Sequence, residues 1–275
     1  MFIELTSLRE SIIEKIKSQQ MGNEKLIILS AGNDSASALY MKKKVEMGNS
    51  LGINTTHIKC NSELELLKTI YSLNEDITVT GIIVQLPLPK GYDTKLILNA
   101  INPNKDVDML TNVNKANMFL GQTDMLPATS TSCTQVVEHF FGNNGGMDIL
   151  LIGRSDLCNN PLVKYFTNKN YTVTQAHSHT KDLEHKVVNS DIVITATATR
   201  NLIKSDWFEF NDYNTKLIID VSTNRNEEGK LCGDVENDVA QFVDVTANPR
   251  GIGTLTVPNL MLNVIKIKGE VKNEY

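Results

Sequence analysis

Gly81-Ile82-Ile83-Val84-Gln85-Leu86-Pro87-Leu88-Pro89-Lys90 is the stretch that decides how this chain folds. Its first half predicts a buried strand, because Ile82, Ile83 and Val84 form a short β-branched run typical of sheets covered on both faces. The strand must end at Leu-Pro-Leu-Pro, since proline cannot donate a ladder hydrogen bond. Gln85 then lies at the carboxyl end of the strand, where open α/β sheets bind ligands. A loop glutamine that only satisfies backbone groups is the alternative interpretation.

Strand and helix patterns alternate ahead of this stretch. Strands are predicted over 25–30 and 55–59, and helices over 36–50 and 62–73. This βα alternation indicates a parallel sheet with helices on its faces. Tyr40 and Lys44 are four residues apart, so they share one helix face and can point into the same space. A lysine-rich, solvated helix face is the structural alternative.

The same pattern restarts after Asp124. Strands are predicted over 147–153, 171–176, 191–196 and 216–221, with helix-length segments between them, as in a Rossmann-like domain. An apolar helix over 256–266 is expected to return to the first domain. The fold class is therefore α/β with two domains: a catalytic domain of residues 1–120 with 255–275, and a dinucleotide-binding domain of residues 121–254.

Composition excludes several classes of protein. The net charge of −5 over 275 residues gives no global reason to expect nucleic acid or an anionic membrane as a partner. The four cysteines have no C-x-x-C spacing, which argues against a disulfide framework or a structural zinc and leads us to expect no metal. No run reaches transmembrane length, so we expect a soluble, cytoplasmic protein.

A second motif, Pro103-x-Lys105-Asp106-Val107-Asp108, follows the opening stretch. This motif is one of a series of motifs that follow one another along nearly the whole chain. The others include the glycine-bearing turn before Tyr40 and Lys44, Gly153-Arg154-Ser155 and Gly251-Ile252-Gly253. In this order the sequence resembles the bifunctional methylenetetrahydrofolate dehydrogenase/methenyltetrahydrofolate cyclohydrolase family, called FolD in bacteria. Single motifs are weak signals, but an ordered series is strong.

The resemblance implies roles in the folate chemistry. Lys44 would be the general acid/base that activates water, and Gln85 would hold Lys44 by a hydrogen bond. Tyr40 would pack over the pterin or aminobenzoate, and Asp108 would accept hydrogen bonds from the pterin amino and ring NH groups. Asp106 is expected to be a structural loop carboxylate. The resemblance also implies three further substrate-binding residues: Ser37, Gly251 and Thr254.

In the second domain the resemblance implies a nucleotide site. Arg154 and Ser155, with Ser178, would meet the adenosine 2′-phosphate, because a guanidinium fork suits a phosphate dianion. NADP is therefore expected as the cofactor, with NAD possible, and a homodimer is expected. The resemblance implies two further cofactor-binding residues, Gly153 and Ala198. His177 and His179 are interpreted as loop or ribose-side residues rather than ligands or bases.

Several positions depart from the family pattern, mostly in the nucleotide half. Asn159 stands where the family has glycine before Pro161, and Cys158 stands where it has valine. Ala198, Arg250 and Met109 also replace glycine. Glycine in such loops permits positive φ or close approach of the backbone to phosphate.

The leading hypothesis is an enzyme that oxidises 5,10-methylenetetrahydrofolate with NADP and hydrolyses the methenyl product to 10-formyltetrahydrofolate. Tetrahydrofolate derivatives are then its small-molecule partners, and one-carbon metabolism is its setting. The first alternative is a cyclohydrolase whose dinucleotide binding is weakened or lost. The second is a non-catalytic relative that binds folate or nucleotide. A Rossmann dehydrogenase acting on a shikimate-like acid is a weaker alternative, because it leaves the Gln-Leu-Pro-Leu-Pro and Lys-Asp-Val-Asp motifs unexplained.

Overall fold

The computed structural model describes residues 1–19, 22–32, 35–210, 212–225 and 227–271. It divides into two compact units, which we call the first and second domains. The first comprises residues 10–128 and 257–275, and the second comprises residues 1–9 and 129–256. The predicted α/β class with two domains is confirmed.

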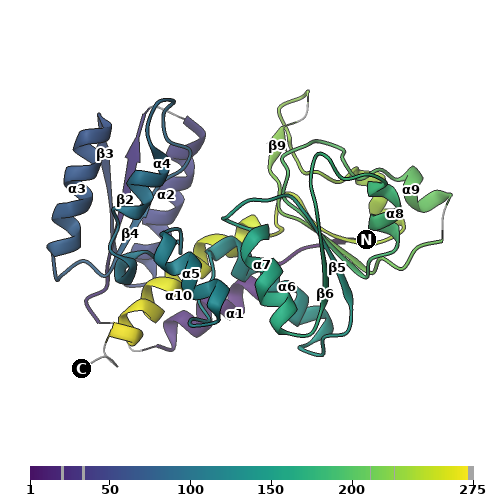
Figure 1. The fold of residues 1–275 in the computed structure, drawn as a ribbon, viewed down its shortest axis with the longest axis horizontal. Helices are drawn as coiled ribbons and strands as arrows, with labels where there is room; N and C mark the ends of the chain where they lie inside the picture. Colours follow the sequence, from purple (N-terminus) through teal and green to yellow (C-terminus); the bar gives the residue numbers. More distant parts are fainter. Residues whose placement is uncertain (20–21, 33–34, 211, 226, 272–275) are drawn as a thin grey trace. The chain divides into compact units, whose positions relative to one another are not determined.

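The first domain is built on a three-stranded parallel sheet in the order β3-β2-β4. The strands are β2 (Lys25–Ala31), β3 (Asn54–Cys60) and β4 (Gly81–Val84). Every residue of β4 is buried, as the β-branched run predicts. Helices α2 (Ser35–Ser50) and α3 (Glu63–Glu75) lie on the two sides of this sheet (Figure 1). Ser62 caps α3 by accepting a hydrogen bond of 3.1 Å from the backbone N–H of Glu65.

The segment after β4 is fixed by tight packing and by one half-buried lysine. A Cβ on Gly81 would lie 2.6 Å from a methyl carbon of Val107, so only glycine fits beside it. Lys105 ends the 3-10 helix η1 (Pro103–Lys105), and its ammonium donates to the carbonyls of Leu73, Asn74 and Asp76 at 2.8, 2.6 and 2.8 Å. These are the orphan carbonyls at the end of α3, so Lys105 caps that helix.

Helices α4 (Thr94–Asn99) and α5 (Asn112–Leu120) complete the middle of the first domain, and α10 (Gly253–Val271) returns to it. The amide of Asn263 on α10 donates to the carbonyls of Val107 and Leu126 at 3.0 and 2.9 Å. The predicted return of the C-terminal helix is therefore confirmed. The helix is longer than the expected 256–266, because its apolar side is buried along most of its length.

The second domain contains a six-stranded parallel sheet in the order β1-β11-β8-β7-β5-β6. Its strands are β5 (Asp148–Ile152), β6 (Thr172–Ala176), β7 (Ile192–Thr195), β8 (Leu217–Asp220), β11 (Asp244–Thr246) and β1 (Phe2–Ile3). One core cluster includes Leu150, Val193, Ile218 and Val245 from four of these strands. Buried apolar runs on adjacent strands thus form the expected doubly covered sheet.

Helices flank this sheet on two sides: α6 (Ala128–Phe141) and α7 (Asn159–Asn168) on one, and α8 (Leu183–Val188) and α9 (Asp206–Glu209) on the other (Figure 1). A short antiparallel pair, β9 (Asn224–Arg225) with β10 (Leu231–Cys232), and the 3-10 helix η2 (Asn237–Gln241) precede β11. Among the described residues no helix is long and apolar enough to cross a membrane.

The division differs from the expected one in the first nine residues, and its other two boundaries lie after residues 128 and 256 instead of 120 and 254. Phe2 and Ile3 pair with Val245 and Thr246, so β1 extends the sheet of the second domain. Helix α1 (Thr6–Lys17) then runs across the division. A two-residue strand carries no periodic pattern, which is why the sequence did not predict it.

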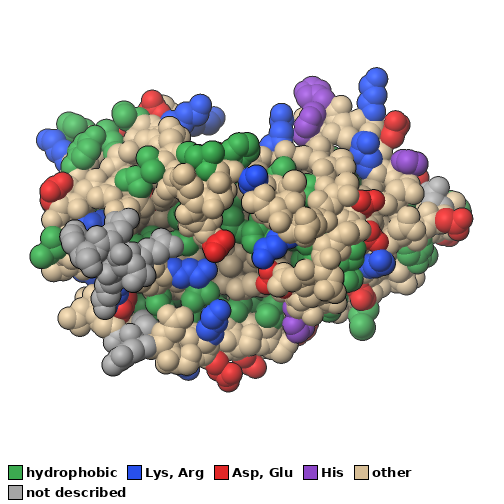
Figure 2. All heavy atoms as spheres, turned by 60° about the horizontal axis from the view of Figure 1, so that its bottom comes forward, with side chains coloured by type: hydrophobic (Ala, Val, Ile, Leu, Met, Phe, Trp, Pro, Cys, Tyr) green, Lys and Arg blue, Asp and Glu red, His purple; other side chains and the backbone are tan. Residues whose placement is uncertain are grey.

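On the face drawn in Figure 2, acidic and basic side chains are interspersed.

Candidate active site

Lys44 and Gln85 meet at the carboxyl end of the first domain's sheet. The Lys44 ammonium donates a hydrogen bond of 3.0 Å to the amide oxygen of Gln85. The backbone N–H of Gln85 donates to Leu29 at 2.8 Å, and its side-chain NH₂ donates to Leu86 at 2.7 Å. Both ends of the amide are therefore engaged, and its oxygen is presented to the lysine.

Tyr40 lies one turn before Lys44 on α2 and is 44 % exposed. The ammonium of Lys43 lies 6.0 Å from its ring centroid, within the range of a weak cation–π contact. An exposed aromatic ring beside Lys44 offers a flat surface to a planar ligand. The structure thus joins Lys44 to Gln85 and places Tyr40 one helical turn before Lys44 on the same helix. The side chain of Ser37 lies outside the described part of the structure.

Asp108 is the third polar group near Lys44. Burial raises the pKa of its carboxyl group, the charge of Lys44 lowers it, and the charge of Asp106 raises it further. None of the described residues donates a hydrogen bond to this carboxylate, so its acceptor capacity is open to a ligand. Met109 follows with a φ of 59°, in the left-handed region that favours the glycine of the family pattern.

Asp106 has a different role from Asp108. It is 1 % exposed, and its carboxylate accepts hydrogen bonds from the backbone N–H of Thr111 at 2.8 Å and from the amide of Asn114 at 3.0 Å. These bonds make it a structural loop carboxylate, in agreement with the prediction. The alternation within Lys105-Asp106-Val107-Asp108 thus separates a buried carboxylate from one that faces Lys44.

A hydroxyl–imidazole pair that the sequence did not predict lies on the strands next to Gln85. The Ser30 hydroxyl lies 2.7 Å from Nε2 of His57, and burial with the charge of Lys59 lowers the pKa of that imidazole. Leu29 pairs with Val84, so Ser30 and Gln85 are the next residues on neighbouring strands and share one face of the sheet. The polar Ser30 within an otherwise apolar strand was the available signal.

The first turn of the second domain has the shape of a phosphate-binding turn. Gly153 has a φ of +124°, and a Cβ on it would lie 2.8 Å from the carbonyl oxygen of Ala196, so glycine is required there. Ile152 pairs with Ala176 on the adjacent strand, which brings the exposed Arg154 and Ser178 to neighbouring strand ends. The hydroxyl of Ser155 accepts from the backbone N–H of Leu157 at 3.2 Å and orders the turn.

The position of the Asn159 side chain decides whether this turn has room for a dinucleotide. Its side chain is fully buried, and its NH₂ donates to the carbonyl of Ile152 at 2.7 Å. Its amide oxygen is the single buried side-chain polar atom without a partner in the described structure. The side chain therefore lies inside the turn and not on its exposed surface. The replacement of glycine by Asn159 thus leaves room for the phosphates, but it leaves one buried hydrogen-bond acceptor without a donor. The residues present fit a dinucleotide.

Two buried carboxylates, given no role in the sequence analysis, organise the other strand ends of the second domain. Asp234 accepts from the hydroxyl of Thr195 at 2.7 Å and from the backbone N–H groups of Thr197 and Thr199, both at 2.8 Å. Asp220 accepts from the N–H of Val235 at 3.0 Å. Burial raises the pKa of Asp220 to about 7, and the charge of Asp234 adds to that rise.

Ala198 belongs to the turn that Asp234 holds. Its φ is 55°, and its N–H donates to the hydroxyl of Ser222 at 3.0 Å. Arg250 likewise has a φ of 78°, and its guanidinium pairs with Glu4 at 2.5 Å. Both residues replace glycines of the family pattern, so the backbone keeps the conformation that glycine favours. Each replacement therefore strains the backbone, because a residue with a Cβ is held in the left-handed region.

Gly251 and Thr254 lie at the start of α10. The Thr254 hydroxyl donates to the carbonyl of Gly251 at 2.7 Å, and a Cβ on Gly251 would lie 2.1 Å from the carbonyl oxygen of Ala247.

His177 and His179 form a T-shaped ring pair with centroids 6.1 Å apart. Within the described residues no group of three or more His, Cys, Asp or Glu could hold a metal ion.

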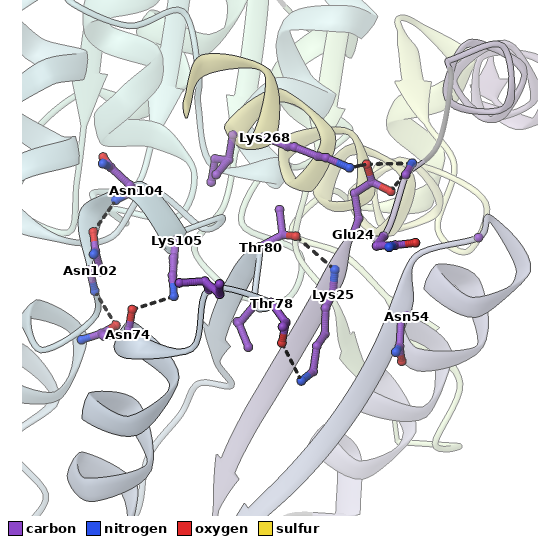
Figure 3. Close-up of a pocket in the computed structure, with 16 residues that line it drawn as sticks. Glu24, Lys25, Asn54, Asn74, Thr78, Thr80, Asn102, Asn104, Lys105 and Lys268 are labelled. Carbon is purple, nitrogen blue, oxygen red and sulfur yellow. Dashed lines mark hydrogen bonds and ion pairs between the residues drawn. The ribbon is translucent and has the colours of Figure 1, made fainter. Parts of the chain in front are cut away.

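A cavity of about 980 Å³ lies at the opposite, amino end of the first domain's sheet (Figure 3). The charged side chains that line it are already paired: Glu24 with Lys268, Lys105 with backbone carbonyls, and Lys25 with Thr78 and Asp76. The cavity therefore offers a ligand no unpaired charge. It is also at the wrong end of parallel strands for the ligand crevice of an α/β sheet. Lys44, at the carboxyl end of the sheet, is therefore a better candidate for the active site than this cavity.

Two family models together cover most of the chain. The catalytic domain of tetrahydrofolate dehydrogenase/cyclohydrolase matches residues 5–108, and the NAD(P)-binding domain of the same family matches residues 127–272. The chain belongs to this family. It is thus an enzyme of the bifunctional dehydrogenase/cyclohydrolase class, as the ordered motifs predicted.

Curated relatives of this family are similar along their whole length. The bifunctional protein FolD of Zymomonas mobilis is 35% identical, over 95% of this chain and 93% of that protein. The bifunctional protein FolD 2 of Lactobacillus johnsonii is 34% identical, over 94% and 92%. Since coverage is nearly complete on both sides, the two share their domain content with this chain.

Solved structures agree with this relation. The FolD enzyme of Campylobacter jejuni superposes with a TM-score of 0.90 at 30% identity, covering 100% of this chain and 99% of that chain. The Trypanosoma brucei dehydrogenase-cyclohydrolase, solved with NADP and an inhibitor, has a TM-score of 0.88 at 25% identity, covering 98% of each chain. Both domains of this family are therefore present here in the same order.

Proposed function

We propose that this enzyme oxidises 5,10-methylenetetrahydrofolate with NADP and then hydrolyses 5,10-methenyltetrahydrofolate to 10-formyltetrahydrofolate in one-carbon metabolism. The observation that carries the proposal is the hydrogen bond between Lys44 and Gln85 beside the open carboxylate of Asp108. A proton-transfer group, a group that orients it and a substrate anchor thus share one sheet end. Proton transfer by a positioned side chain accelerates reactions by about 10²–10⁴-fold.

Each residue of the first domain takes one part of the reaction. Lys44 exchanges protons with the water that attacks the methenyl carbon and with folate N10. Gln85 holds the Lys44 ammonium at a fixed position. Asp108 accepts hydrogen bonds from the pterin amino and ring NH groups, which a carboxylate with free lone pairs suits. Tyr40 offers its exposed ring to the pterin or aminobenzoate, and Ser37, Gly251 and Thr254 complete the proposed substrate contacts.

The second domain supplies the cofactor site. NADP, when bound, would accept hydride from the methylene bridge. Gly153 permits close approach of the phosphates to the backbone, and Arg154, Ser155 and Ser178 suit a 2′-phosphate, because the guanidinium and the two hydroxyls offer several donors. Ala198 lies at the exit of β7, where open sheets meet their ligand. NAD would lack the group that Arg154 recognises.

One assay tests this proposal directly. Methylenetetrahydrofolate is mixed with NADP or with NAD, and formation of the methenyl product is followed by its absorbance. We expect turnover with NADP, and we expect Arg154→Ser to reduce the preference for NADP over NAD by at least about tenfold, the loss of one charged phosphate contact. Equal use of NADP and NAD by the unmodified enzyme would contradict the role given to Arg154.

A cyclohydrolase with weakened dinucleotide binding is the second candidate. The replacement of loop glycines by Asn159, Ala198 and Arg250 favours it, because strain and an unsatisfied acceptor gather in the nucleotide loops. Titration with NADP and NAD separates the two functions, since the absence of saturable binding of either cofactor would contradict the bifunctional proposal. A non-catalytic relative is no longer a candidate, because the chain belongs to a family of enzymes. We further propose a cytoplasmic homodimer, on the family resemblance alone.

A further inference from the structure

Two of the four cysteines lie against each other in the second domain. Cys133 on α6 is fully buried, and Cys158, directly before α7, is 3 % exposed. Both are free thiols, and their side chains are joined by a hydrogen bond. The neighbouring Ser130 hydroxyl, one helical turn before Cys133, donates to the carbonyl of Cys158 at 2.9 Å. This face of α6 therefore contacts the segment around Cys158 through two independent side chains.

Cys158 is part of the turn assigned to the dinucleotide phosphates. Its backbone N–H donates to the carbonyl of Ser155 at 3.2 Å, and that of Asn160 donates to the same carbonyl at 3.0 Å. Any change in the position of Cys158 is therefore passed to Ser155 and to the turn that begins at Gly153. The family pattern has valine here, and valine cannot be oxidised.

We propose that Cys133 and Cys158 form an oxidisable dithiol, a modification site at which a peroxide closes a disulfide between α6 and the phosphate-binding turn. The proposal that the turn responds rests on the proposed dinucleotide function, whereas disulfide formation does not. A cytosolic disulfide of this kind is reversible, because cellular thiols reduce it again.

The reaction proceeds in two balanced steps. The thiolate of one cysteine attacks a peroxide oxygen, the O–O bond breaks, and a sulfenic acid and water form. The second thiol sulfur then attacks the sulfenic sulfur, the S–O bond breaks, the S–S bond forms, and a second water leaves. Two thiols have lost two hydrogens and two electrons, and hydrogen peroxide has been reduced to two waters.

Cys158 is the better first nucleophile of the pair. It directly precedes the ten-residue helix α7 and is 3 % exposed, whereas Cys133 is fully buried. The pKa of Cys133 is raised well above its ordinary value by its hydrogen bond to Cys158, by burial and by the charge that Cys158 carries when ionised. Cys133 is then the thiol that resolves the sulfenic acid.

The other two cysteines are internal controls for reactivity. Cys60 is equally buried, and its thiol donates to the Thr69 hydroxyl at 3.8 Å. Cys232 is partly exposed, and like Cys60 it is a free thiol. Exposure alone would make Cys232 the first site of oxidation, with added oxygen. Proximity predicts instead that the pair loses two hydrogens, with no added oxygen.

The test treats the full-length Cys60→Ser/Cys232→Ser variant with millimolar hydrogen peroxide. We expect an intact mass lower by two hydrogens, a disulfide-linked peptide pair containing Cys133 and Cys158, and restoration by dithiothreitol. Cys133→Val and Cys158→Val, added singly to this background, should abolish the loss while keeping an apolar side chain at the site. Addition of oxygen without the linked pair in the parent variant would overturn the proposal.

A second measurement tests the link to the turn. The dissociation constant for NADP is measured for the reduced, oxidised and re-reduced parent variant. Because an S–S bond of about 2.05 Å is far shorter than a contact between thiols, we expect at least about threefold weaker binding after oxidation and recovery after reduction. An unchanged constant with the disulfide closed would refute the coupling. Absence of NADP binding in the reduced protein would refute the dinucleotide function instead, and leave the mass result standing.

Discussion

The amide oxygen of Gln85 and the ammonium of Lys44 are joined by a hydrogen bond of 3.0 Å, although the two residues lie 41 positions apart. The central position of β2 in the sheet order β3-β2-β4 explains this meeting. Helix α2 follows β2, and Gln85 directly follows β4, which is the neighbour of β2. The segments that follow these two adjacent parallel strands thus lie at the same end of the sheet, where Lys44 and Gln85 meet.

Replacement of Lys44 by methionine should abolish the hydrolytic activity. Methionine keeps the length of the side chain but removes its ability to exchange protons. We expect the rate of methenyltetrahydrofolate hydrolysis to fall by at least about a hundredfold, as for the loss of a general acid/base. Lys42→Met is the matched control, since the Lys42 ammonium lies on the exposed side of α2, 3.8 Å from Glu46. Equal losses in both variants would contradict the role of Lys44.

Gln85 should act only through Lys44. Gln85→Leu removes the acceptor, and we expect a loss of about tenfold in kcat, the size of one hydrogen bond to a charged group. Because the two residues work as one unit, the double variant Lys44→Met/Gln85→Leu should be no slower than Lys44→Met alone. The measurement is steady-state hydrolysis of the methenyl substrate by all three variants. A further loss in the double variant would show that Gln85 acts independently.

The stability of the second domain should depend on pH through Asp220. Its carboxyl group has an ordinary pKa of 3.8, and burial raises it to about 7 in the folded state. Between these values the folded protein holds a proton that the unfolded chain has released, so raising the pH favours unfolding. The loss is complete above the folded pKa and amounts to at most roughly 4 kcal/mol.

Asp220→Asn isolates this contribution. The amide cannot ionise, so the advantage of the unmodified enzyme over the variant should shrink as the pH rises from about 5 to about 8. Denaturant unfolding of both proteins at several pH values measures the difference, and effects of other carboxylates cancel in it. A difference that is constant over this range would mean that Asp220 is already ionised in the folded protein at the lower pH.

The left-handed turn at Ala198 should be relieved by glycine. Ala198→Gly removes the Cβ at a φ of 55°, and we expect a gain of about 1 kcal/mol in the free energy of unfolding. Ala196→Gly, two residues earlier, is the control, because Ala196 is not among the positive-φ residues and should lose about the same amount. Thermal or denaturant unfolding decides. Destabilisation by both changes would show that the Ala198 side chain contributes contacts that outweigh the strain.

The sequence predicted the elements whose patterns are local. The β-branched run of β4, the apolar strands of the second domain and the Tyr40–Lys44 helix face all follow from spacing within a few residues. Strand β1 was missed, because two residues bear no period and their pairing with β11 spans almost the whole chain. Ser30 and His57 were missed for a similar reason, since neighbouring strands had to be placed in register before the pair could be seen.

The nucleotide loops were predicted in part. The sequence identified the replaced glycines, and the structure shows that Ala198 and Arg250 keep positive φ, whereas Asn159 places its side chain inside the turn. No local pattern distinguishes these two outcomes. The contact of Cys133 with Cys158 is also invisible in the sequence, because their spacing matches no motif and depends on how α6 packs beside the turn.

The bonds of Lys105 have a consequence for ligands that compete with folate. With its ammonium fixed to three carbonyls at the end of α3, and with Asp106 tied to Thr111 and Asn114, the segment that presents Asp108 is already ordered on both sides. Binding there carries little entropic penalty for arranging the protein. The affinity of an inhibitor that binds Asp108 should then depend on how well its hydrogen-bond donors match the fixed position of this carboxylate. Making such an inhibitor more rigid should therefore improve its affinity more than making it larger.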